Sequence, residues 1–158
     1  MEQNTPLKRD PALRHLSHDH HHGLLLCWKI RQGFKLGIEP ARMKHYCEWF
    51  WTSYLAPHFE EEEKAIFPVL PEEDPLIKQA CTEHKRLRKL FASWENPEKT
   101  LGQIEEKLEK HIRFEERILF PAVQEKATAK QLETIAAEAD REKFMENEQD
   151  PFWVRSAR

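Results

Sequence analysis

The sequence is poor in glycine and contains no long hydrophobic run. Only 4 of its 158 residues are glycine, whereas a β-rich chain of this length uses glycine in many of its tight turns. No stretch approaches the roughly 18 consecutive apolar residues of a membrane-spanning helix, and residues 1–10 lack the apolar run of a signal peptide. We therefore expect a helical, soluble and cytoplasmic protein with no membrane partner.

Cysteine and net positive charge are also scarce. The three cysteines, Cys27, Cys47 and Cys81, are odd in number and form no C-x-x-C pair, which argues against a disulfide framework or a zinc knuckle. We expect Cys27 and Cys81 to be inward or semi-inward packing residues. The formal net charge is −3, with both signs interspersed along the chain. A nucleic-acid-binding domain would show a basic patch instead, so we expect no nucleic acid partner.

Four helix-start signals divide the chain. Each is an acidic or amide residue directly before a proline, which is typical of a helix cap followed by the first helical residue. The signals are Asp10-Pro11, Glu39-Pro40, Asp74-Pro75 and Asn96-Pro97. The expected ends are Gly33 with Gly37 for the first helix, Pro68 with Pro71 for the second and Pro121 for the fourth. Pro57 should kink the second helix.

Apolar residues spaced three and four apart give each predicted helix one inward face. The inward positions are Leu13, Leu16, His20, Leu24 and Cys27 in the first helix; Met43, Cys47, Phe50, Tyr54, His58, Glu62, Ala65 and Val69 in the second; Leu76, Ala80, His84, Leu87, Phe91 and Trp94 in the third; and Leu101, Ile104, Leu108, His111, Glu115, Ile118 and Ala122 in the fourth. Short loops and antiparallel neighbours then place the four inward histidines at about the same level.

The chain after the fourth helix is expected to add one more. Thr128-x-x-Gln131 is a capping box that predicts a shorter fifth helix from Thr128 to about Lys143. Its expected inward residues are Leu132, Ile135, Ala136 and Ala139. We therefore expect a tail at residues 1–10, a four-helix bundle at residues 11–125, and a C-terminal helix and tail at residues 126–158. Within that tail, Phe152 to Val154 either docks or frays.

One short motif occurs twice. The segments His58 to Pro68 and His111 to Pro121 align without a gap, 53 positions apart, and each carries a histidine and a glutamate at i and i+4. On a helix this spacing places both side chains on one face. A weaker repeat, Asp19-His20 and Glu83-His84, lies upstream of each copy. Four helices with one inward histidine each, two of them adding a glutamate, predict a carboxylate-bridged two-metal site.

This donor set selects a class of metal. Imidazole and carboxylate suit iron, manganese and zinc, whereas the lack of inward thiolates disfavours a sulfur site. Two bridging glutamates would hold the ions about 3.5 to 4 Å apart. Each ion would have four protein ligands, leaving positions for an oxide or hydroxide bridge and for dioxygen, nitric oxide or peroxide.

These motifs, each H-x-x-x-E being followed by Phe-Pro, resemble the hemerythrin-like, or HHE, cation-binding family over about residues 11–125. The resemblance implies an all-α, up-down antiparallel four-helix bundle around a non-haem di-iron centre. The implied cofactor is two Fe ions, oxo- or hydroxo-bridged, with Mn or Zn as substitutes. The implied metal ligands are His20, His58, His84 and His111, with Glu62 and Glu115 bridging.

Two positions depart from the oxygen-carrying hemerythrins. Those proteins have a further histidine four residues after the third-helix one, where this chain has Arg88. They also end with H-x-x-x-x-D, a spacing at which this chain offers Glu116, although Glu115 matches its own first repeat better. The pattern is closer to a bacterial branch with four histidines, which includes di-iron proteins linked to nitric oxide stress and iron-sulfur repair.

Three functions follow as alternatives. The first is a protein that binds or senses dioxygen or nitric oxide at the two-metal site. The second is a di-iron oxidoreductase or iron-sulfur-repair-type protein acting on peroxide or nitric oxide. The third is a metal-free helical interaction module. The electron donor, the protein partner and the oligomeric state are not specified by the sequence.

Other polar and aromatic residues near the motifs receive plainer interpretations. We expect a solvated charged face at Glu60, Glu61, Glu63 and Glu116. We expect solvent-facing side chains, with an accessory metal or a ligand exchange of His18 for His20 as the alternative, at His15, His18, His21 and His22. Tyr54 is expected to pack in the core or to hydrogen-bond near the metals. The walls of the bundle, or a partner surface, are expected to include Trp49, Trp51 and Trp94.

Overall fold

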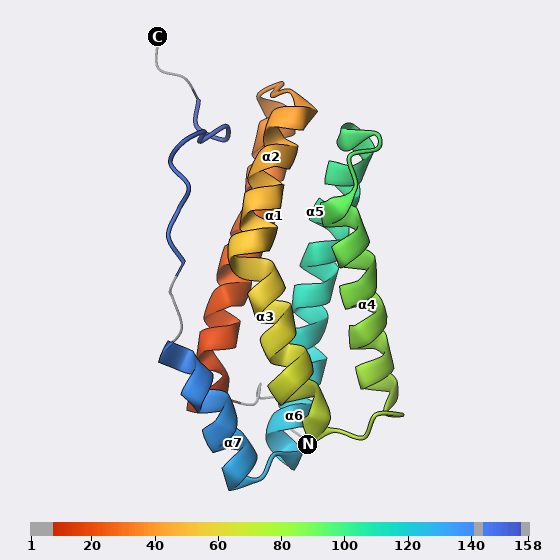
Figure 1. Cartoon of the computed structure of the whole chain (residues 1–158), viewed down its shortest axis with the longest axis vertical. Helices are drawn as coiled ribbons and strands as arrows, with labels where there is room; N and C mark the ends of the chain where they lie inside the picture. The colour runs from red at the N-terminus through yellow and green to blue at the C-terminus, as the bar shows by residue number, and fades with distance from the viewer. Residues whose placement is uncertain (1–7, 141–143, 156–158) are drawn as a thin grey trace, which may run out of the picture.

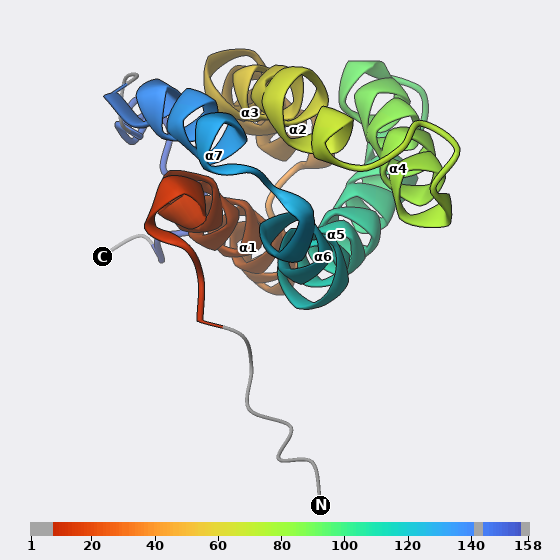
Figure 2. The same cartoon turned by 90° about the horizontal axis from the view of Figure 1, so that it is seen from below.

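The computed structural model describes residues 8–140 and 144–155, which form helices and connecting segments without any β-strand. Four helical columns run up and down side by side (Figure 1), and from one end they enclose a common interior (Figure 2). The columns are α1 (Arg14–Lys35) after a 3-10 turn (Pro11–Leu13); α2 (Pro40–Phe50) with α3 (Ala56–Glu61); α4 (Pro75–Ala92); and α5 (Pro97–Phe114) with α6 (Phe120–Lys126). The predicted all-α bundle is confirmed.

Each predicted start signal lies at the start of a helical column. The Asp10 carboxylate accepts a hydrogen bond from the Ala12 N–H at 2.9 Å, and Asp74 accepts one from Leu76 at 2.8 Å. Asn96, in the left-handed region at φ 43°, accepts from the Lys99 N–H at 3.4 Å. These side chains satisfy N–H groups that have no partner within the first turn of a helix.

The two glycines expected to end the first helix have different roles. Gly37, at φ +70°, follows α1 and reverses the chain in a conformation that glycine adopts without strain. Gly33 instead lies inside α1, where an added Cβ would come within 2.2 Å of the Met43 Sδ. Gly33 therefore allows α1 to approach α2 closely. The prediction that it marks the end of the helix is wrong.

Three π turns interrupt the second and fourth columns, at Trp51–Leu55, Glu62–Ile66 and Glu115–Leu119. Two of them begin at the glutamates of the repeated motif. The Phe67 N–H bonds to the Glu62 carbonyl, and the Phe120 N–H bonds to the Glu115 carbonyl, each five residues back. Such turns are rare and are frequently found at functional sites.

A π turn inserts one extra residue into the helical repeat, so the inward face after it moves by one position. Ile118, predicted to face inward, is 51% exposed, and Leu119 is buried in its place. Ala65, Val69 and Ala122 are likewise only partly buried, while the next residues, Ile66, Leu70 and Val123, form the core. The prediction from an uninterrupted helical period is wrong here because it does not include the residue that the π turn inserts.

The prolines in these columns sit next to the π turns. The interruption predicted at Pro57 takes the form of the π turn Trp51–Leu55, which directly precedes α3. The prediction that Pro121 ends the fourth helix is wrong, because α6 continues to Lys126. Pro121 lies in the first turn of α6, a position at which a missing N–H and a fixed φ are tolerated. The second column ends at Val69, as Pro68 and Pro71 predict.

The register shift predicts opposite results for two neighbouring substitutions. Leu119→Ala should destabilise the protein by about 2 to 5 kcal/mol because it opens a cavity in the core. Ile118→Ala should change stability by less than about 0.5 kcal/mol, as expected for an exposed position. Urea unfolding of both variants measures the difference. Equal losses, or a larger loss for Ile118→Ala, would contradict the π turn.

A layer of polar residues divides the apolar interior into two clusters. Along each column the inward histidine separates residues of one cluster from residues of the other. One cluster, toward the α1–α2 connection, includes Cys27, Ile30, Leu87, Phe91 and Leu108. The second, toward α7, includes Leu13, Leu16, Ala80, Leu119 and Phe120. The site therefore has rigid apolar packing on both sides, which fixes the level of its side chains.

The chain after the bundle folds back along it. The fifth helix, α7 (Ala129–Ala136), starts with the predicted capping box and continues as a 3-10 turn (Ala137–Asp140). Ile135 is buried and Leu132 partly so, whereas Ala136 and Ala139 are exposed, so the predicted inward face is too wide. The predicted end near Lys143 lies outside the described residues. The segment after residue 143 runs along the bundle on the side of α1 (Figure 1), and Phe152 is buried in the apolar cluster that lies toward the α1–α2 connection.

Two other predicted positions are wrong. Trp94 lies beyond the end of α4 and is 40% exposed, because the helix stops at Ala92. Cys81 is exposed on α4, while Cys27 and Cys47 are buried. Burial raises the pKa of both buried thiols to about 12, which keeps them protonated and unreactive at neutral pH. No helix in the described part of the chain is both long and apolar enough to span a bilayer.

Candidate metal centre

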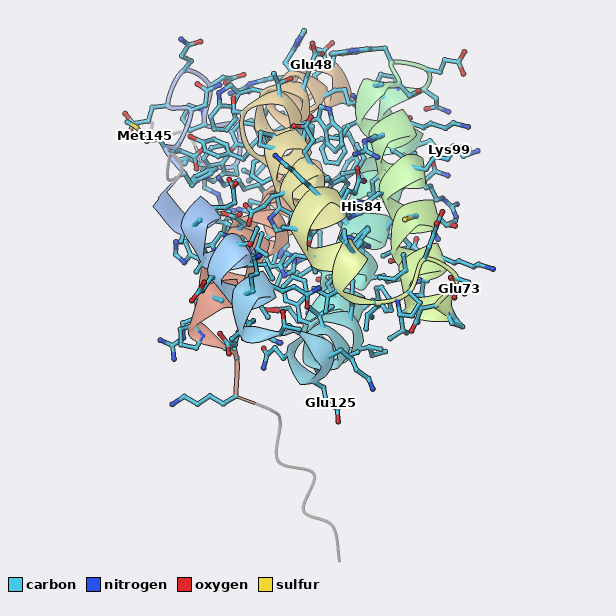
Figure 3. The ribbon with its side chains drawn as sticks, turned by 60° about the horizontal axis from the view of Figure 1, so that its bottom comes forward. Glu48, Glu73, His84, Lys99, Glu125 and Met145 are labelled. Atoms are coloured by element: carbon cyan, nitrogen blue, oxygen red, sulfur yellow. The ribbon has the colours of Figure 1, made fainter. Side chains whose placement is uncertain are left out.

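All six predicted ligands lie together in the interior of the bundle. Each is at most 4% exposed, and they come from four different columns. Figure 3 shows one of them, His84, in the middle of the bundle, away from surface residues such as Glu73 and Lys99. The six form two groups of four potential ligand atoms, each group within 4.8 Å, and the two glutamates belong to both groups.

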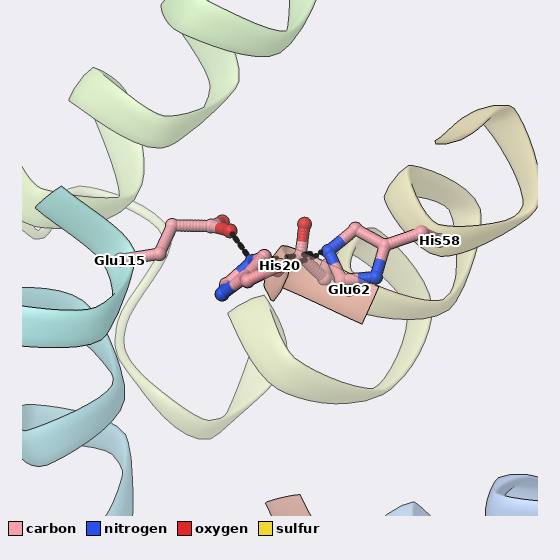
Figure 4. Close-up of side chains that lie close together, drawn as sticks. All are labelled: His20, His58, Glu62 and Glu115. Atoms are coloured by element: carbon pink, nitrogen blue, oxygen red, sulfur yellow. Dashed lines mark hydrogen bonds and ion pairs between the residues drawn. The ribbon is translucent and has the colours of Figure 1, made fainter. Parts of the chain in front are cut away.

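The first half of the site joins α1 to α3 (Figure 4). The Nε2 atoms of His20 and His58 are 3.2 Å apart. Glu115 Oε1 lies 2.8 Å from His20 Nε2, and Glu62 Oε2 lies 3.2 Å from His58 Nε2. Two ring nitrogens and one oxygen from each glutamate therefore surround a single point.

The second half joins α4 to α5 in the same way. Glu62 Oε1 lies 3.2 Å from His84 Nε2, and Glu115 Oε2 lies 3.3 Å from His111 Nε2. Each glutamate thus turns one oxygen to each half of the site. This is the arrangement needed for two carboxylates that bridge a pair of ions.

Several donor atoms of the six residues are buried without a hydrogen-bond partner. They are both carboxylate oxygens of Glu62, Oε2 of Glu115, and Nε2 of His84 and of His111. A buried polar atom without a partner costs free energy, and a buried charge costs more. Metal ions at the two half-sites would coordinate all of these atoms and offset the two negative charges. The residues present therefore fit a two-metal group.

The charges of these residues are strongly linked in the absence of metal. Burial alone would lower the pKa of His58, but the charge of Glu62 and a hydrogen bond to Asp19 raise it to about 9. Burial alone would raise the pKa of Glu115, yet the charge of His111 and its hydrogen bonds hold it well below its usual value. The neighbouring carboxylates thus favour the protonated form of these histidines when no metal is bound, so protons compete with metal ions for the same ring nitrogens.

A second set of carboxylates fixes the orientation of the histidines. Each histidine turns Nε2 toward the interior and Nδ1 toward a carboxylate of a neighbouring column. Three pairs are hydrogen-bonded: Asp19 with His58 at 3.0 Å, Glu63 with His84 at 2.7 Å, and Glu83 with His111 at 2.7 Å. In the fourth pair, Glu116 lies 3.6 Å from His20 Nδ1, beyond hydrogen-bond distance. These carboxylates favour the tautomer with the proton on Nδ1, which leaves Nε2 free for a metal.

A family model described as the hemerythrin HHE cation binding domain matches residues 11–123. The chain belongs to this family. The matched region contains all six central residues and the four columns as far as residue 123 in α6, and it ends before α7. No curated protein and no solved structure matches the chain. The chain is therefore a hemerythrin HHE domain whose buried histidine and glutamate cluster fits a metal site.

Two of the orienting carboxylates of this hemerythrin HHE domain contradict the sequence interpretation. The sequence pattern predicts a solvated face at Glu63 and Glu116, but both are half-buried and face a central histidine. Burial would raise the pKa of Glu63, and His84 and Arg88 together lower it to about 2. The available signal was the repetition itself, since Glu62-Glu63 and Glu115-Glu116 both continue the motif with a second acid.

The other charged residues of the motif region differ from one another. Glu60 is exposed, as predicted, whereas Glu61 is buried and bonded to His15. His15 is therefore half-buried in a hydrogen bond and does not face solvent. His18 and His21 are exposed, and His22 is half-buried. The prediction of solvent-facing histidines is correct for His18 and His21 only.

A narrow cavity of about 10 Å³ adjoins the first half-site. His20 and His58 line it together with Tyr54 and Phe144, so residues beyond the bundle contribute to its wall. The Tyr54 hydroxyl hydrogen-bonds to the backbone of Met145, at 2.6 Å to the N–H and 3.0 Å to the carbonyl. Tyr54 thus positions the C-terminal segment, and the alternative of a hydrogen bond near the metals is not realised.

The orienting carboxylates lead to a testable expectation. Glu83→Gln should weaken metal binding about 10- to 100-fold, the range found for residues that orient metal-bound histidines. The fold should persist, because Glu83 is on the surface side of the His111 ring. Competition with a coloured chelator measures the affinity, and Glu60→Gln on the exposed face is the matched control. Equal affinities in the two variants would show that Glu83 does not orient His111.

Proposed function

We propose that this hemerythrin HHE domain holds two metal ions, iron in the cell, and binds or senses dioxygen or nitric oxide at them. His20 and His58 would hold the first ion, and His84 and His111 the second. Glu62 and Glu115 would bridge the two. The observation that supports this most strongly is the division of each carboxylate between the half-sites, with one oxygen facing each histidine pair.

The protein residues prepare the site in three ways. Their carboxylates supply two negative charges, which attract cations into an otherwise apolar interior. The orienting acids hold each imidazole in the metal-binding tautomer. Apolar clusters pack on both sides of the site, and a small cavity adjoins it beside His20 and His58. A bound iron pair would supply reversible ligand binding and one-electron redox chemistry.

Arg88 supports an arrangement with two histidines at each ion. It occupies the position at which oxygen-carrying hemerythrins have a further histidine, and its guanidinium donates a hydrogen bond to Glu63 at 2.8 Å. Glu63 in turn contacts His84. Arg88 thus strengthens the support of an existing ligand and adds none, which favours a four-histidine centre for sensing or handling a diatomic ligand over oxygen transport.

A metal-free interaction module agrees poorly with the same interior. Such a protein would have no reason to bury two carboxylates when three of their four oxygens lack hydrogen-bond partners. Replacing a buried charged cluster by apolar residues is often neutral or stabilising. Retention of the cluster therefore favours a ligand that uses its charge.

Iron analysis combined with visible spectroscopy tests the proposal. The protein, expressed in iron-rich medium, should contain two irons per chain, and its absorption should change when dioxygen or nitric oxide is added. Turnover of peroxide or nitric oxide with an added electron donor would indicate the oxidoreductase alternative instead. Protein that contains no iron would refute both.

A further inference from the structure

Three histidines outside the centre form a cluster on the surface of α1. His18, His21 and His22 are at positions i, i+3 and i+4, so they project from neighbouring points of the helix. Their ring centroids are 5.1 Å apart for His18 and His22, 5.5 Å for His21 and His22, and 6.5 Å for His18 and His21. Among the described residues, none of the three side chains has a hydrogen-bond partner, and the Nδ1 of His22 is buried.

These separations match those of imidazoles that share one metal ion. A ring nitrogen binds such an ion at about 2.0 to 2.1 Å, which places the ring centroid about 3.2 Å from it. The centroids of two such rings then lie about 4.5 Å apart when the nitrogen–metal–nitrogen angle is a right angle, and about 5.2 Å apart when it is tetrahedral. They lie about 6.4 Å apart when the two nitrogens are on opposite sides of the ion. The two shorter separations fall inside this range and the third lies just outside it. The side chains must turn before their ring nitrogens meet at one ion, because the three do not form a group of ligand atoms within 4.8 Å in this structure.

We propose that His18, His21 and His22 form a surface site for a borderline divalent transition metal ion and that this site delivers ions to the buried centre. Neutral imidazoles suit zinc, nickel, copper and ferrous iron. Three protein ligands leave coordination positions for water, which makes such a site open and its ion exchangeable.

The position of His22 connects the cluster with the interior. His22 lines the same cavity as His20 and His58, so it is the member of the surface cluster that adjoins the first half-site. The Phe144 ring stacks on the His22 ring at a centroid distance of 4.1 Å and an interplanar angle of 16°, which restricts its orientation. An ion released from the cluster would meet Asp19, His20 and His58, which line this cavity with His22. This delivery step rests on the proposed function of the buried centre, whereas binding at the surface does not.

A zinc titration of metal-free protein tests the binding site. The wild type should bind three Zn²⁺ per chain, and the triple variant His18→Ala, His21→Ala and His22→Ala should bind two. His45→Ala, at an exposed histidine of α2, is the control and should still bind three. Equal stoichiometry in the wild type and the triple variant would overturn the site. If the buried centre bound nothing, the wild type would bind one ion and the triple variant none, which separates this failure from that of the proposed function.

The rate of metal uptake tests the delivery step. Stopped-flow mixing of metal-free protein with limiting Fe²⁺ should show uptake by the buried centre that is severalfold slower in the triple variant, with an unchanged endpoint. Circular dichroism of both proteins controls for folding. Equal rates would overturn delivery through the cluster. A lower endpoint would also overturn it, because it would mean that the histidines contribute to the centre itself.

Discussion

Glu62→Ala is expected to release metal from both halves of the centre at once. Each glutamate gives one oxygen to each half-site, so its removal takes a ligand from both ions and half of the negative charge that holds them. The metal content of the buried centre should fall from two ions per chain to less than one. The increase in melting temperature produced by metal should disappear as well, because only bound ions stabilise the folded state.

The comparison with other variants makes this result specific. Glu115→Ala should have the same effect, since Glu115 divides its oxygens in the same way. His20→Ala should act mainly on the first half-site and leave His84 and His111 able to hold an ion. Glu60→Ala, on the exposed face, should change neither metal content nor melting temperature. A Glu62→Ala protein that retains two ions would show that Glu62 is not a bridge.

The metal-free protein should become less stable as the pH rises from about 6.5 to 9. His58 has a pKa of about 9 in the folded protein, above the value of about 6.5 of an unfolded histidine. A raised pKa stabilises the folded state fully below the unfolded pKa, and this contribution is lost as the pH rises through the folded pKa. His58 alone then accounts for about 3 kcal/mol of this loss. His20 and His84, whose pKa values are also raised, act in the same direction.

Metal binding should show the opposite dependence on pH. An imidazole must lose its proton before its nitrogen can bind a metal, so protons compete with the ions. Affinity should therefore rise between about pH 6.5 and 9, while stability of the metal-free protein falls. Urea unfolding at about pH 6.5 and about pH 9 measures the free energy of unfolding of the chelator-treated protein, with the metal-loaded protein as the control. A metal-free protein whose stability is constant or increases over this range would contradict the protonation of these histidines.

The grouping of the six central residues could be predicted because it depends on local geometry. A histidine and a glutamate four residues apart share a helix face whatever the rest of the chain does. The start signals at Asp10, Asp74 and Asn96 likewise act within one turn and are found where they were predicted. Short connections between columns then placed the four histidines at one level. That these residues bind metal stays a prediction.

The π turns could not be predicted from the sequence. They depend on whether a backbone N–H donates to the carbonyl four residues back, as in an α-helix, or to the one five residues back. The bond from Phe120 to the Glu115 carbonyl closes a longer ring than a helical bond, and no residue in Glu115–Leu119 requires it. Periodicity alone continues the helix unchanged and turns Ile118 inward. Glu115 offers a physical reason for this π turn, since the turn begins at the residue whose carboxylate both half-sites share.

The orienting acids were missed for a different reason. A run of acidic residues in a helix usually belongs to a solvated face, and composition does not show which of them faces a histidine on another column. Glu63 and Glu116 have that position only once four columns are assembled. The docking of the C-terminal segment through Phe144 and Phe152 also depends on contacts with residues far away in the sequence, such as that between Tyr46 and Glu146, which are 100 positions apart.

Anomalous X-ray diffraction from crystals of the iron-loaded protein is the most direct test of the two-metal centre. Two iron peaks should lie about 3.5 to 4 Å apart, one between His20 and His58 and the other between His84 and His111. The carboxylates of Glu62 and Glu115 should each contact both peaks. A single peak, or peaks that contact only one of these histidine pairs, would contradict the account.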